Sequence, residues 1–264
     1  MKIRCLLATL TGLALAVPAG AQDLSGLSDP LVADRPDFTE STLTIAPGHF
    51  QVEGGATFSR FGDEESLSLG EILVRIGTGE RVETRLGIGS YSRIDPGFAG
   101  AGTVSGYEDP FVGIKVRLNE SDSNLRPPGR PAVSLLFSTS IPVGDDELTA
   151  DEWQPEGKLL LAWDLPWFSL SSNLIYGYPV DGDERFHQFG ATLSAGFSLT
   201  DRIGMYVETF GFNKEGVDGS STQYIDSGLT FSVSNDLQLD ARVGIGLDDP
   251  SPNWFAGIGA AVRF

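Results

Sequence analysis

The sequence is poor in the residues that support several common kinds of protein chemistry. Its single cysteine is Cys5, and only two histidines, His49 and His187, occur in 264 residues. One cysteine cannot form an intramolecular disulfide, and two distant histidines do not make a metal-ligand cluster. A G-x-S-x-G motif of a serine hydrolase is also missing from the sequence. We therefore expect no cofactor and no metal, and we predict that the protein is not an enzyme.

Positive charge is scarce as well, with 18 Lys and Arg against 36 Asp and Glu. Such an acidic surface repels nucleic acid, so we expect no nucleic-acid partner. Long apolar runs are confined to the start of the chain, where Lys2 and Arg4 precede an apolar stretch over residues 5–17 and Ala19-Gly20-Ala21 follows it. This order is typical of a cleaved signal peptide, here residues 1–21. Beyond it, no apolar run approaches the roughly 18 residues of a membrane-spanning helix.

What remains is rich in Gly, Ser, Thr, aromatic and β-branched residues, a composition that favours strands. One segment, 236–247, alternates strictly, with Leu239, Val243 and Ile245 on one face and Asp240 and Arg242 on the other. Most candidate strands reach the roughly nine to eleven residues that a tilted membrane-spanning strand needs, whereas strands of soluble sheets usually have about five or six. The candidate strands are 49–60, 66–76, 80–92, 108–119, 130–142, 156–165, 167–178, 185–199, 201–212, 221–233, 236–247 and 253–264.

The connections between these strands alternate in length. Tight turns at 77–80, 164–167, 198–202 and 234–237 alternate with longer and mostly acidic loops, of which 143–154 is an example. This asymmetry is typical of an outer-membrane barrel, whose short turns face the periplasm and whose long loops face outside. The connection 119–129 breaks the pattern, and we interpret it as an extended periplasmic turn. We predict an all-β membrane barrel of about 12 antiparallel strands over residues 48–264, in the outer membrane of a Gram-negative bacterium.

The last strand, 253–264, carries apolar residues at every second position and ends on Phe264. If it closes a barrel, this apolar face contacts lipid, with Trp254 near one membrane interface and Phe264 near the other. The strand also resembles the C-terminal signature by which the barrel-assembly machinery recognises outer-membrane proteins. That resemblance implies Phe264 as the assembly signal and the machinery as a partner.

Charged side chains share the parity opposite to the apolar positions, which predicts a polar lumen because charges facing acyl chains are costly. Strand 66–76 fits poorly, since Glu71 and Arg75 pointing inward would bring Leu67 and Leu69 in with them. A bulge that shifts the register is the favoured interpretation, ahead of a contact with a plug or an apolar ligand. The predicted lumen and solute-pathway residues are Glu53, Arg81, Glu83, Arg85, Tyr91, Lys115, Arg117, Tyr206, Glu208, Tyr224, Asp226, Asp240 and Arg242. Inward aromatic residues, which also include Phe210 and Phe255, either stack on an aromatic solute or simply fill space.

Several motifs carry a resemblance to a known family over residues 34–264. They are Asp34-Arg35-Pro36-Asp37-Phe38-Thr39-Glu40-Ser41, Pro47-Gly48, Gln51-Val52-Glu53-Gly54-Gly55, residues 108–115, Pro131-Ala132, Ile141-Pro142-Val143-Gly144 and Val262-Arg263-Phe264. The sequence resembles the "Putative MetA-pathway of phenol degradation" family, with Glu108-Asp109-Pro110 departing from the glycine that usually precedes the aspartate. The resemblance implies a porin-like, transporter-like outer-membrane barrel for small solutes, with aromatic or hydrophobic compounds as candidates.

The polar segment 22–47 is too long to be only a leader to the first strand. Either it folds into the lumen as a plug, pairing its charges with those of the wall, or it forms a periplasmic tail. The plug candidates are Asp34, Arg35, Asp37, Phe38 and Glu40.

The predicted polar lumen and what the family resemblance implies together favour a channel or transporter for small solutes. The alternatives are a structural or surface-interaction barrel that transports nothing, a barrel lipid hydrolase, and a soluble periplasmic β-protein. The expected partners are outer-membrane lipid, lipopolysaccharide, the barrel-assembly machinery and a small-molecule solute. The acidic loops either bind divalent cations that also bridge lipopolysaccharide or serve solvation and cell-surface charge, and the second interpretation is favoured because no EF-hand pattern is present.

Overall fold

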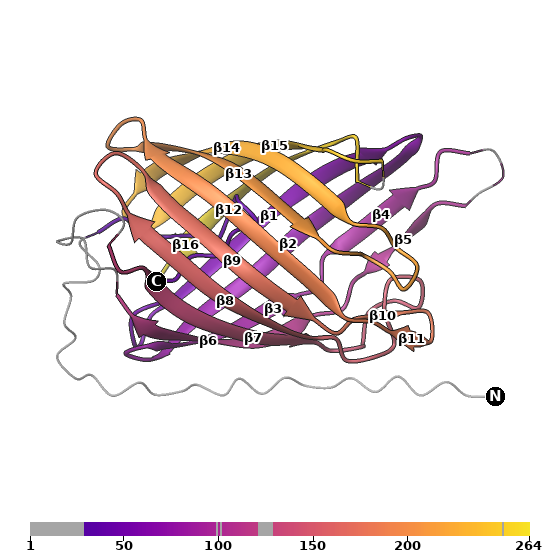
Figure 1. Cartoon of the computed structure of the whole chain (residues 1–264), viewed down its shortest axis with the longest axis horizontal. Helices are drawn as coiled ribbons and strands as arrows, with labels where there is room; N and C mark the ends of the chain where they lie inside the picture. Colours follow the sequence, from indigo (N-terminus) through magenta and orange to yellow (C-terminus); the bar gives the residue numbers. More distant parts are fainter. Residues whose placement is uncertain (1–28, 99, 101, 121–128, 250) are drawn as a thin grey trace, which may run out of the picture.

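The computed structural model describes residues 29–98, 100, 102–120, 129–249 and 251–264 (Figure 1). The predicted signal peptide, residues 1–21, lies outside these residues, as do residues 22–28 of the N-terminal segment. None of the described residues form a helix that is long and apolar enough to cross a membrane.

The described chain is built from antiparallel strands that follow one another around a single sheet. Their bounds are β1 (Phe50–Phe61), β2 (Glu64–Gly79), β3 (Val82–Ile88), β4 (Tyr91–Asp95), β5 (Val104–Tyr107), β6 (Phe111–Asn119), β7 (Ala132–Ser140), β8 (Pro155–Asp164), β9 (Ser169–Gly177), β10 (Val180–Asp181), β11 (Glu184–Arg185), β12 (Gln188–Ser198), β13 (Ile203–Phe212), β14 (Thr222–Ser234), β15 (Leu237–Gly246) and β16 (Trp254–Arg263).

The sheet closes on itself because β1 pairs with β2 on one side and with β16 on the other. β3 and β4 are successive pieces of one strand that both pair with β2, and β5 and β6 are the corresponding pieces of the next. Counted this way, the described residues form a closed twelve-stranded antiparallel barrel, and β10 and β11 form a small separate hairpin in one loop. The predicted fold class is therefore confirmed.

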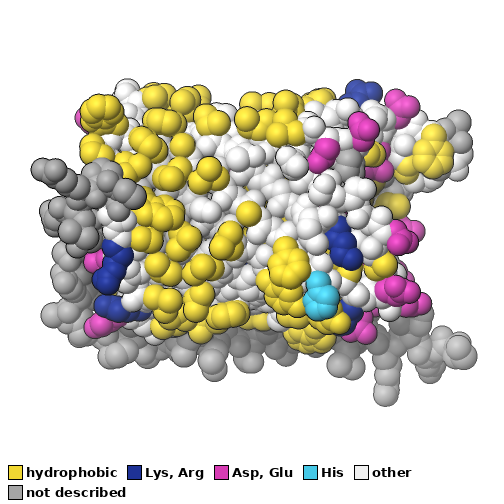
Figure 2. Space-filling view, in the orientation of Figure 1, with side chains coloured by type: hydrophobic (Ala, Val, Ile, Leu, Met, Phe, Trp, Pro, Cys, Tyr) yellow, Lys and Arg dark blue, Asp and Glu magenta, His cyan; other side chains and the backbone are white. Residues whose placement is uncertain are grey.

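The two faces of the barrel wall follow the alternation in the sequence. On β15, Leu239, Val243 and Ile245 are 46–57% exposed, whereas Gln238 and Asp240 are 8% and 7% exposed. Figure 2 shows hydrophobic side chains spread over the wall, while most of the visible Asp and Glu side chains lie toward the end from which β4 and β5 project. Apolar side chains outside and polar ones inside are the arrangement that a barrel in lipid requires.

The two ends of the barrel differ in their connections, as expected, except that the β1–β2 connection at the end of the longer loops is a tight turn of residues 62–63. We call the end with the β2–β3, β8–β9, β12–β13 and β14–β15 turns the short-turn end, and the opposite end the long-loop end. The C-terminus lies at the short-turn end (Figure 1). The β6–β7 connection is at this end too, although its residues 121–128 lie outside the described residues.

The bulge expected in strand 66–76 is present in β2. Gly70 and Glu71 both have positive φ, 101° and 44°, and the β1–β2 register shifts beside them, between Glu53 and Gly55. As a result Leu67 pairs with the outward Phe58, while Glu71 still reaches the interior. An extra residue in one strand is what lets the two halves of β2 present opposite parities.

The prediction for Tyr91 is wrong in its direction, because the strand predicted over 80–92 is broken between β3 and β4. A Cβ at Gly89 would collide with the backbone carbonyl of Glu108, so this position requires glycine. After it, the chain continues as β4 in a new register. Tyr91 then pairs with the outward Leu69, and its ring contacts Tyr107, which is 60% exposed. Ser92 takes the inward place instead.

Candidate functional site

Residues 29–47 enter the barrel, and we call them the plug. The Leu31 N–H donates to the Asn235 carbonyl at 2.7 Å, in the turn between β14 and β15. At the other end, the Gly48 N–H donates to the Gly77 carbonyl at 3.1 Å, beside the turn between β2 and β3. The plug therefore enters and leaves through the short-turn end, which is the first of the two arrangements considered from the sequence.

Asp34 is the centre of the contacts between the plug and one side of the wall. Its carboxylate oxygen Oδ2 lies 2.5 Å from Arg85 Nη1, 3.0 Å from Lys115 Nζ and 3.4 Å from Arg75 Nη1. Oδ1 accepts the Ser41 N–H at 2.9 Å, which folds the plug back on itself. Burial raises the pKa of Asp34, but the charges of Arg75, Lys115 and Arg85 outweigh it and hold the pKa well below its ordinary value.

Arg75 is fully buried, and wall and plug share its donors. Its guanidinium lies 2.9 Å from Glu83 and 3.0 Å from Glu53, and it donates to the plug carbonyls of Val32 at 3.0 Å and Leu43 at 3.1 Å. Removing one of these acceptors would be strongly destabilising, because it would leave part of a buried positive charge without a partner.

Glu40 forms a second anchor, nearer the long-loop end. Its carboxylate lies 2.8 Å from Lys158 Nζ and 3.0 Å from Arg85 Nη2. Burial raises the pKa of Glu40, but the charges of Arg85 and Lys158 outweigh it and lower the pKa to about 2. Glu40 is therefore an ionised partner for these two basic groups at ordinary pH.

These contacts define a cationic wall, made of Arg75, Arg85, Lys115 and Lys158 on β2, β3, β6 and β8. The wall itself supplies three carboxylates to the four basic groups, from Glu53, Glu83 and Glu156. It thus has an excess of one positive charge, which the two plug carboxylates of Asp34 and Glu40 more than offset. Ion pairs buried in this way hold the plug only while both partners are present.

The opposite side of the lumen is an acidic wall, made of Glu208, Asp226 and Asp240 on β13, β14 and β15. Glu208 accepts the backbone N–H groups of Phe38 at 2.6 Å and Thr39 at 2.7 Å, and also the Thr39 hydroxyl. Asp240 lies 3.5 Å from the Arg35 guanidinium. Here the wall binds mainly the plug backbone.

Arg35 reaches the seam at which the first and last strands meet. Its guanidinium lies 2.5 Å from Glu71 and 3.2 Å from the Ile258 carbonyl. A Cβ at Gly55 on β1 or Gly259 on β16 would collide with the guanidinium. The absence of a side chain at these two glycines therefore leaves room for Arg35.

Asp37 faces the acidic wall, and its environment disfavours a charge. Its carboxyl accepts the Ser194 hydroxyl at 3.2 Å. Burial and the neighbouring Glu208 carboxylate raise the pKa of Asp37 well above its ordinary value.

Aromatic rings meet at the tip of the plug. The Phe38 ring stacks on Phe210 with centroids 4.5 Å apart and lies edge-on to Phe212 at 5.8 Å. Phe210 in turn stacks on Tyr224 at 4.6 Å. Lys158 Nζ lies 5.6 Å from the centroid of the Phe38 ring, so the ring contacts both an aromatic surface and a cation.

Two hollows flank this aromatic stack. A cavity of about 740 Å³ at the short-turn end is lined by Pro36, Asp37 and Tyr206 among others, and one of about 240 Å³ at the long-loop end by Glu215 and Tyr224 among others. Because Phe38 follows Asp37 and connects through Phe210 to Tyr224, the stack lies between the two hollows.

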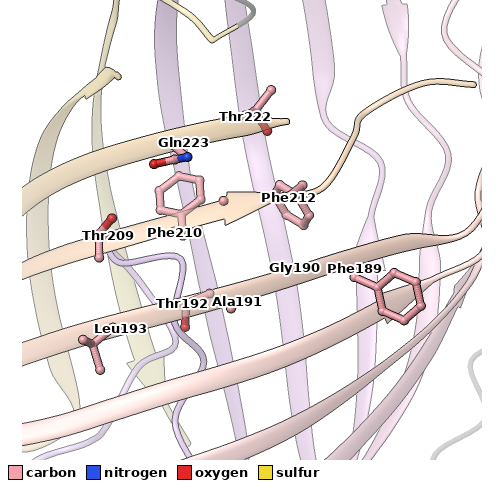
Figure 3. Close-up of a pocket in the computed structure, with 11 residues that line it drawn as sticks. Phe189, Gly190, Ala191, Thr192, Leu193, Thr209, Phe210, Phe212, Thr222 and Gln223 are labelled. Carbon is pink, nitrogen blue, oxygen red and sulfur yellow. The ribbon is translucent and has the colours of Figure 1, made fainter. Parts of the chain in front are cut away.

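A third hollow of about 500 Å³ runs along β12, β13 and the start of β14 (Figure 3). Phe189 and Leu193, which line it, are 56% and 47% exposed and belong to the outer face. None of the residues that line this groove carries a charged side chain.

The structure brings most of the predicted lumen residues together around the plug. Arg81 and Arg117 instead lie at the short-turn rim, where their guanidinium groups donate to the carbonyls of Leu118 and Glu80. The predicted residues buried inside the barrel, or half-buried for the last, are Glu53, Glu83, Arg85, Lys115, Tyr206, Glu208, Tyr224, Asp226, Asp240 and Arg242.

Uncharged residues of the wall also hold the plug, and the sequence reasoning did not select them. Ser134 donates to the Thr42 carbonyl at 2.6 Å, Gln51 donates to the Val32 carbonyl at 3.1 Å, and Thr192 contacts the Thr39 hydroxyl at 2.7 Å. Their inward parity was a usable signal, but a hydroxyl on a strand is too common to select by itself. Among the described residues, no group of three or more His, Cys, Asp and Glu side chains is placed to hold a metal ion.

Comparison with known proteins gives a family and a fold. A family model described as "Putative MetA-pathway of phenol degradation" matches residues 33–264. The chain is similar to an outer membrane channel from Pseudomonas putida F1, with a TM-score of 0.65 and 13% identity, covering 84% of this chain and 97% of that one. No curated protein matches it in sequence.

Two porins share the architecture at lower similarity. The NanC porin has a TM-score of 0.53 and 12% identity, covering 81% of this chain and 98% of its own. The KdgM porin, in complex with disordered oligogalacturonate, has a TM-score of 0.51 and 10% identity, covering 82% of this chain and 99% of its own. At such low identity these likenesses show the fold.

Proposed function

Since the chain belongs to the family described as "Putative MetA-pathway of phenol degradation", we propose that it is an outer-membrane channel for small solutes, closed by its own plug. The fold that it shares with solved outer-membrane channels and porins supports a passage along the barrel axis. In this orientation the short-turn end faces the periplasm and the long-loop end faces outside.

The observation that carries this proposal is the docking of the plug across the lumen. Asp34 and Glu40 contact the cationic wall, Glu208 accepts backbone N–H groups of Phe38 and Thr39 from the acidic wall, and the Phe38 ring stacks on Phe210. A lumen lined with charges of both signs suits polar or amphipathic small solutes, and its aromatic rings suit aromatic ones. Passage then requires the plug to leave at least one wall.

The surroundings of the barrel follow from the same proposal. The exposed apolar belt contacts outer-membrane lipid, and the acidic long loops contact lipopolysaccharide through divalent cations. Phe264, whose ring stacks on Phe50 at 4.8 Å at the short-turn end, serves as the assembly signal for the barrel-assembly machinery.

The test is solute flux through the purified full-length chain and a variant that lacks residues 29–47. In planar bilayers and in liposome swelling, we expect little conductance from the full chain and a clear increase on deletion. Gel mobility before and after boiling checks that each barrel is folded. If the folded deletion variant conducts no ions and passes no solute, the protein is a structural or surface-interaction barrel and the proposal fails.

Membrane fractionation tests the location, and a covalent probe for reactive serines tests the remaining alternative. Failure to sediment with outer membranes would contradict the outer-membrane placement. Labelling by the probe would support a lipid hydrolase and contradict a channel without catalysis.

A further inference from the structure

The tip of the plug presents two side chains with the chemistry of one small molecule. Phe38 contributes an aromatic ring and Glu40, two residues later, contributes a carboxylate. Lys158 Nζ lies 2.8 Å from the Glu40 carboxylate and 5.6 Å from the centroid of the Phe38 ring. One wall cation therefore lies close to both the aromatic ring and the carboxylate of the plug tip.

Each of the two side chains is surrounded by wall residues of complementary chemistry. The ring lies on Phe210, nearly parallel at an interplanar angle of 15°, and against the edge of Phe212 at 88°. Stacked and edge-on contacts are the two preferred geometries for aromatic pairs, so this is a ring site with defined walls. The carboxylate accepts a charge-assisted hydrogen bond from Lys158 Nζ at 2.8 Å and forms an ion pair with the Arg85 guanidinium at 3.0 Å.

Withdrawal of the plug would leave these wall groups short of partners. Lys158 would keep Glu156, at 3.2 Å, and Arg85 would keep Glu83, at 3.1 Å. Because Glu83 also binds Arg75, however, the cationic wall would regain its positive excess. Buried basic groups without enough counter-charge favour the entry of an anion, and the exposed faces of Phe210 and Phe212 favour an aromatic one.

We propose that Phe38 and Glu40 occupy the binding site of the solute, that the solute is an aromatic carboxylate, and that it competes with the plug tip for this site. This inference rests on the proposed channel function. The solute binds only when the tip has left, so its binding energy favours the open barrel over the closed one. The plug is then an internal competitor whose two tip side chains imitate the ring and the acid group.

The experiment measures benzoate binding to the full-length, detergent-solubilised barrel by calorimetry, with solute flux measured in parallel. The double variant Phe38→Ala/Glu40→Gln removes the two imitating groups and leaves the wall intact. We expect it to bind benzoate at least about tenfold more tightly than the unchanged protein, because the competition is lost. Glu152→Gln, on an exposed loop side chain, is the matched control and should leave the affinity unchanged.

Two further comparisons locate the site and define the ligand class. Adding Lys158→Met to the double variant should weaken benzoate binding about tenfold or more, since the cation shared by ring and carboxylate is lost. Phenol, which has the ring without the carboxylate, and cyclohexanecarboxylate, which has the carboxylate without the ring, should both bind more weakly than benzoate. Heat-dependent gel mobility confirms folding, and the single variants Phe38→Ala and Glu40→Gln replace the double one if it does not fold.

The outcomes separate this inference from the channel proposal. If the folded double variant conducts ions but binds benzoate no better than the unchanged protein, the competition is wrong and the channel stands. Equal binding of benzoate and cyclohexanecarboxylate, or binding that survives loss of Lys158, also overturns the inference. If even the variant without residues 29–47 conducts nothing, the channel proposal itself fails.

Discussion

The two walls of the lumen hold the same plug by different means. The cationic wall binds plug side chains, since Asp34 and Glu40 place their carboxylates among its basic groups. The acidic wall binds mainly plug backbone, since Glu208 accepts N–H groups that any residue at positions 38 and 39, other than proline, would supply. A single substitution in the plug can therefore cut the first attachment, whereas the second is cut from the wall.

The two attachments also differ in the protonation state that they require of the plug carboxyl groups. The contacts with the cationic wall depend on ionised plug carboxylates, while Asp37, which faces the acidic wall, is favoured in its neutral form. One plug thus combines groups with opposite proton requirements, and the closed state is most stable where both are met.

The largest effect is expected from Asp34→Ala, which breaks the side-chain attachment at its centre. The change leaves Arg75, Arg85 and Lys115 with one carboxylate fewer in a buried site, at a cost of about 3–5 kcal/mol. We expect the closed state to lose more than about a hundredfold in its equilibrium with the open state, seen as higher conductance in planar bilayers.

The control for this change is Asp29→Ala in the same segment, where Arg263 contacts the backbone carbonyl of Asp29. Its conductance should stay that of the unchanged protein. Equal conductance of the Asp34 and Asp29 variants would show that the ion pairs do not close the barrel.

Glu208→Gln attacks the backbone attachment from the acidic wall and should have a smaller effect. A neutral amide keeps one acceptor but loses the charge assistance of its bonds to Phe38 and Thr39, at about 2 kcal/mol. This corresponds to about a thirtyfold shift toward the open state in the same conductance measurement. An effect larger than that of Asp34→Ala would reverse the ranking of the two walls.

The pH dependence of conductance tests the two walls separately, because titration changes the charge of a plug side chain and not its size. Because the pKa of Asp37 is raised in the docked plug, its contribution to docking is present at low pH and is lost as pH rises through that raised value. Conductance should therefore increase toward alkaline pH, and Asp37→Asn should remove this increase. An unchanged pH profile in Asp37→Asn would assign the titration to another group.

Glu40 should give the opposite pH dependence of conductance, because its pKa is lowered to about 2. Its docking contribution is present above the ordinary carboxyl pKa and is lost as pH falls toward the lowered value. Opening in acid should disappear in part in Glu40→Gln, which has no such proton to bind. Conductance recorded from neutral to acidic pH on both proteins checks this, and parallel profiles would contradict it.

The smallest effect is expected from Ser134→Ala, which removes one uncharged contact with the plug. The Thr42 carbonyl loses a hydrogen bond of 2.6 Å inside the barrel, worth about 1 kcal/mol. Hydrogen exchange of the plug amides should accelerate about fivefold, while Ser138→Ala on the same strand should leave it unchanged. No acceleration in Ser134→Ala would mean that the contact contributes nothing to docking.

Much of the barrel could be predicted from the sequence, because the direction of each side chain depends on its position along its own strand. Parity along each strand decides which side chains face lipid, and this placed Glu83, Lys115 and Asp240 inside without knowledge of any neighbour. Tyr91 was misplaced because a steric contact between Gly89 and Glu108, which parity does not record, breaks the strand. Leu67 and Leu69 needed a bulge whose existence, but not position, could be inferred.

The site itself was less accessible, since its contacts join distant parts of the chain. Asp34 and Lys115 are 81 residues apart, and Glu40 and Lys158 are 118 apart. The sequence offered the charges on both sides and left the choice between plug and tail open, because no periodicity in 22–47 encodes a partner. Which carboxylate meets which basic group is decided by distances across the closed barrel.

The entry and exit of the plug through one end have a mechanical consequence. Tension applied at residue 29 from the short-turn side would break the attachments one after another, first at Leu31, then at Asp34, and then at the tip. Peeling of this kind needs far less force than tearing all the contacts at once, and nothing has to be threaded through the cylinder. The other end stays tied to β1, so the released segment would hang from the rim, ready to return.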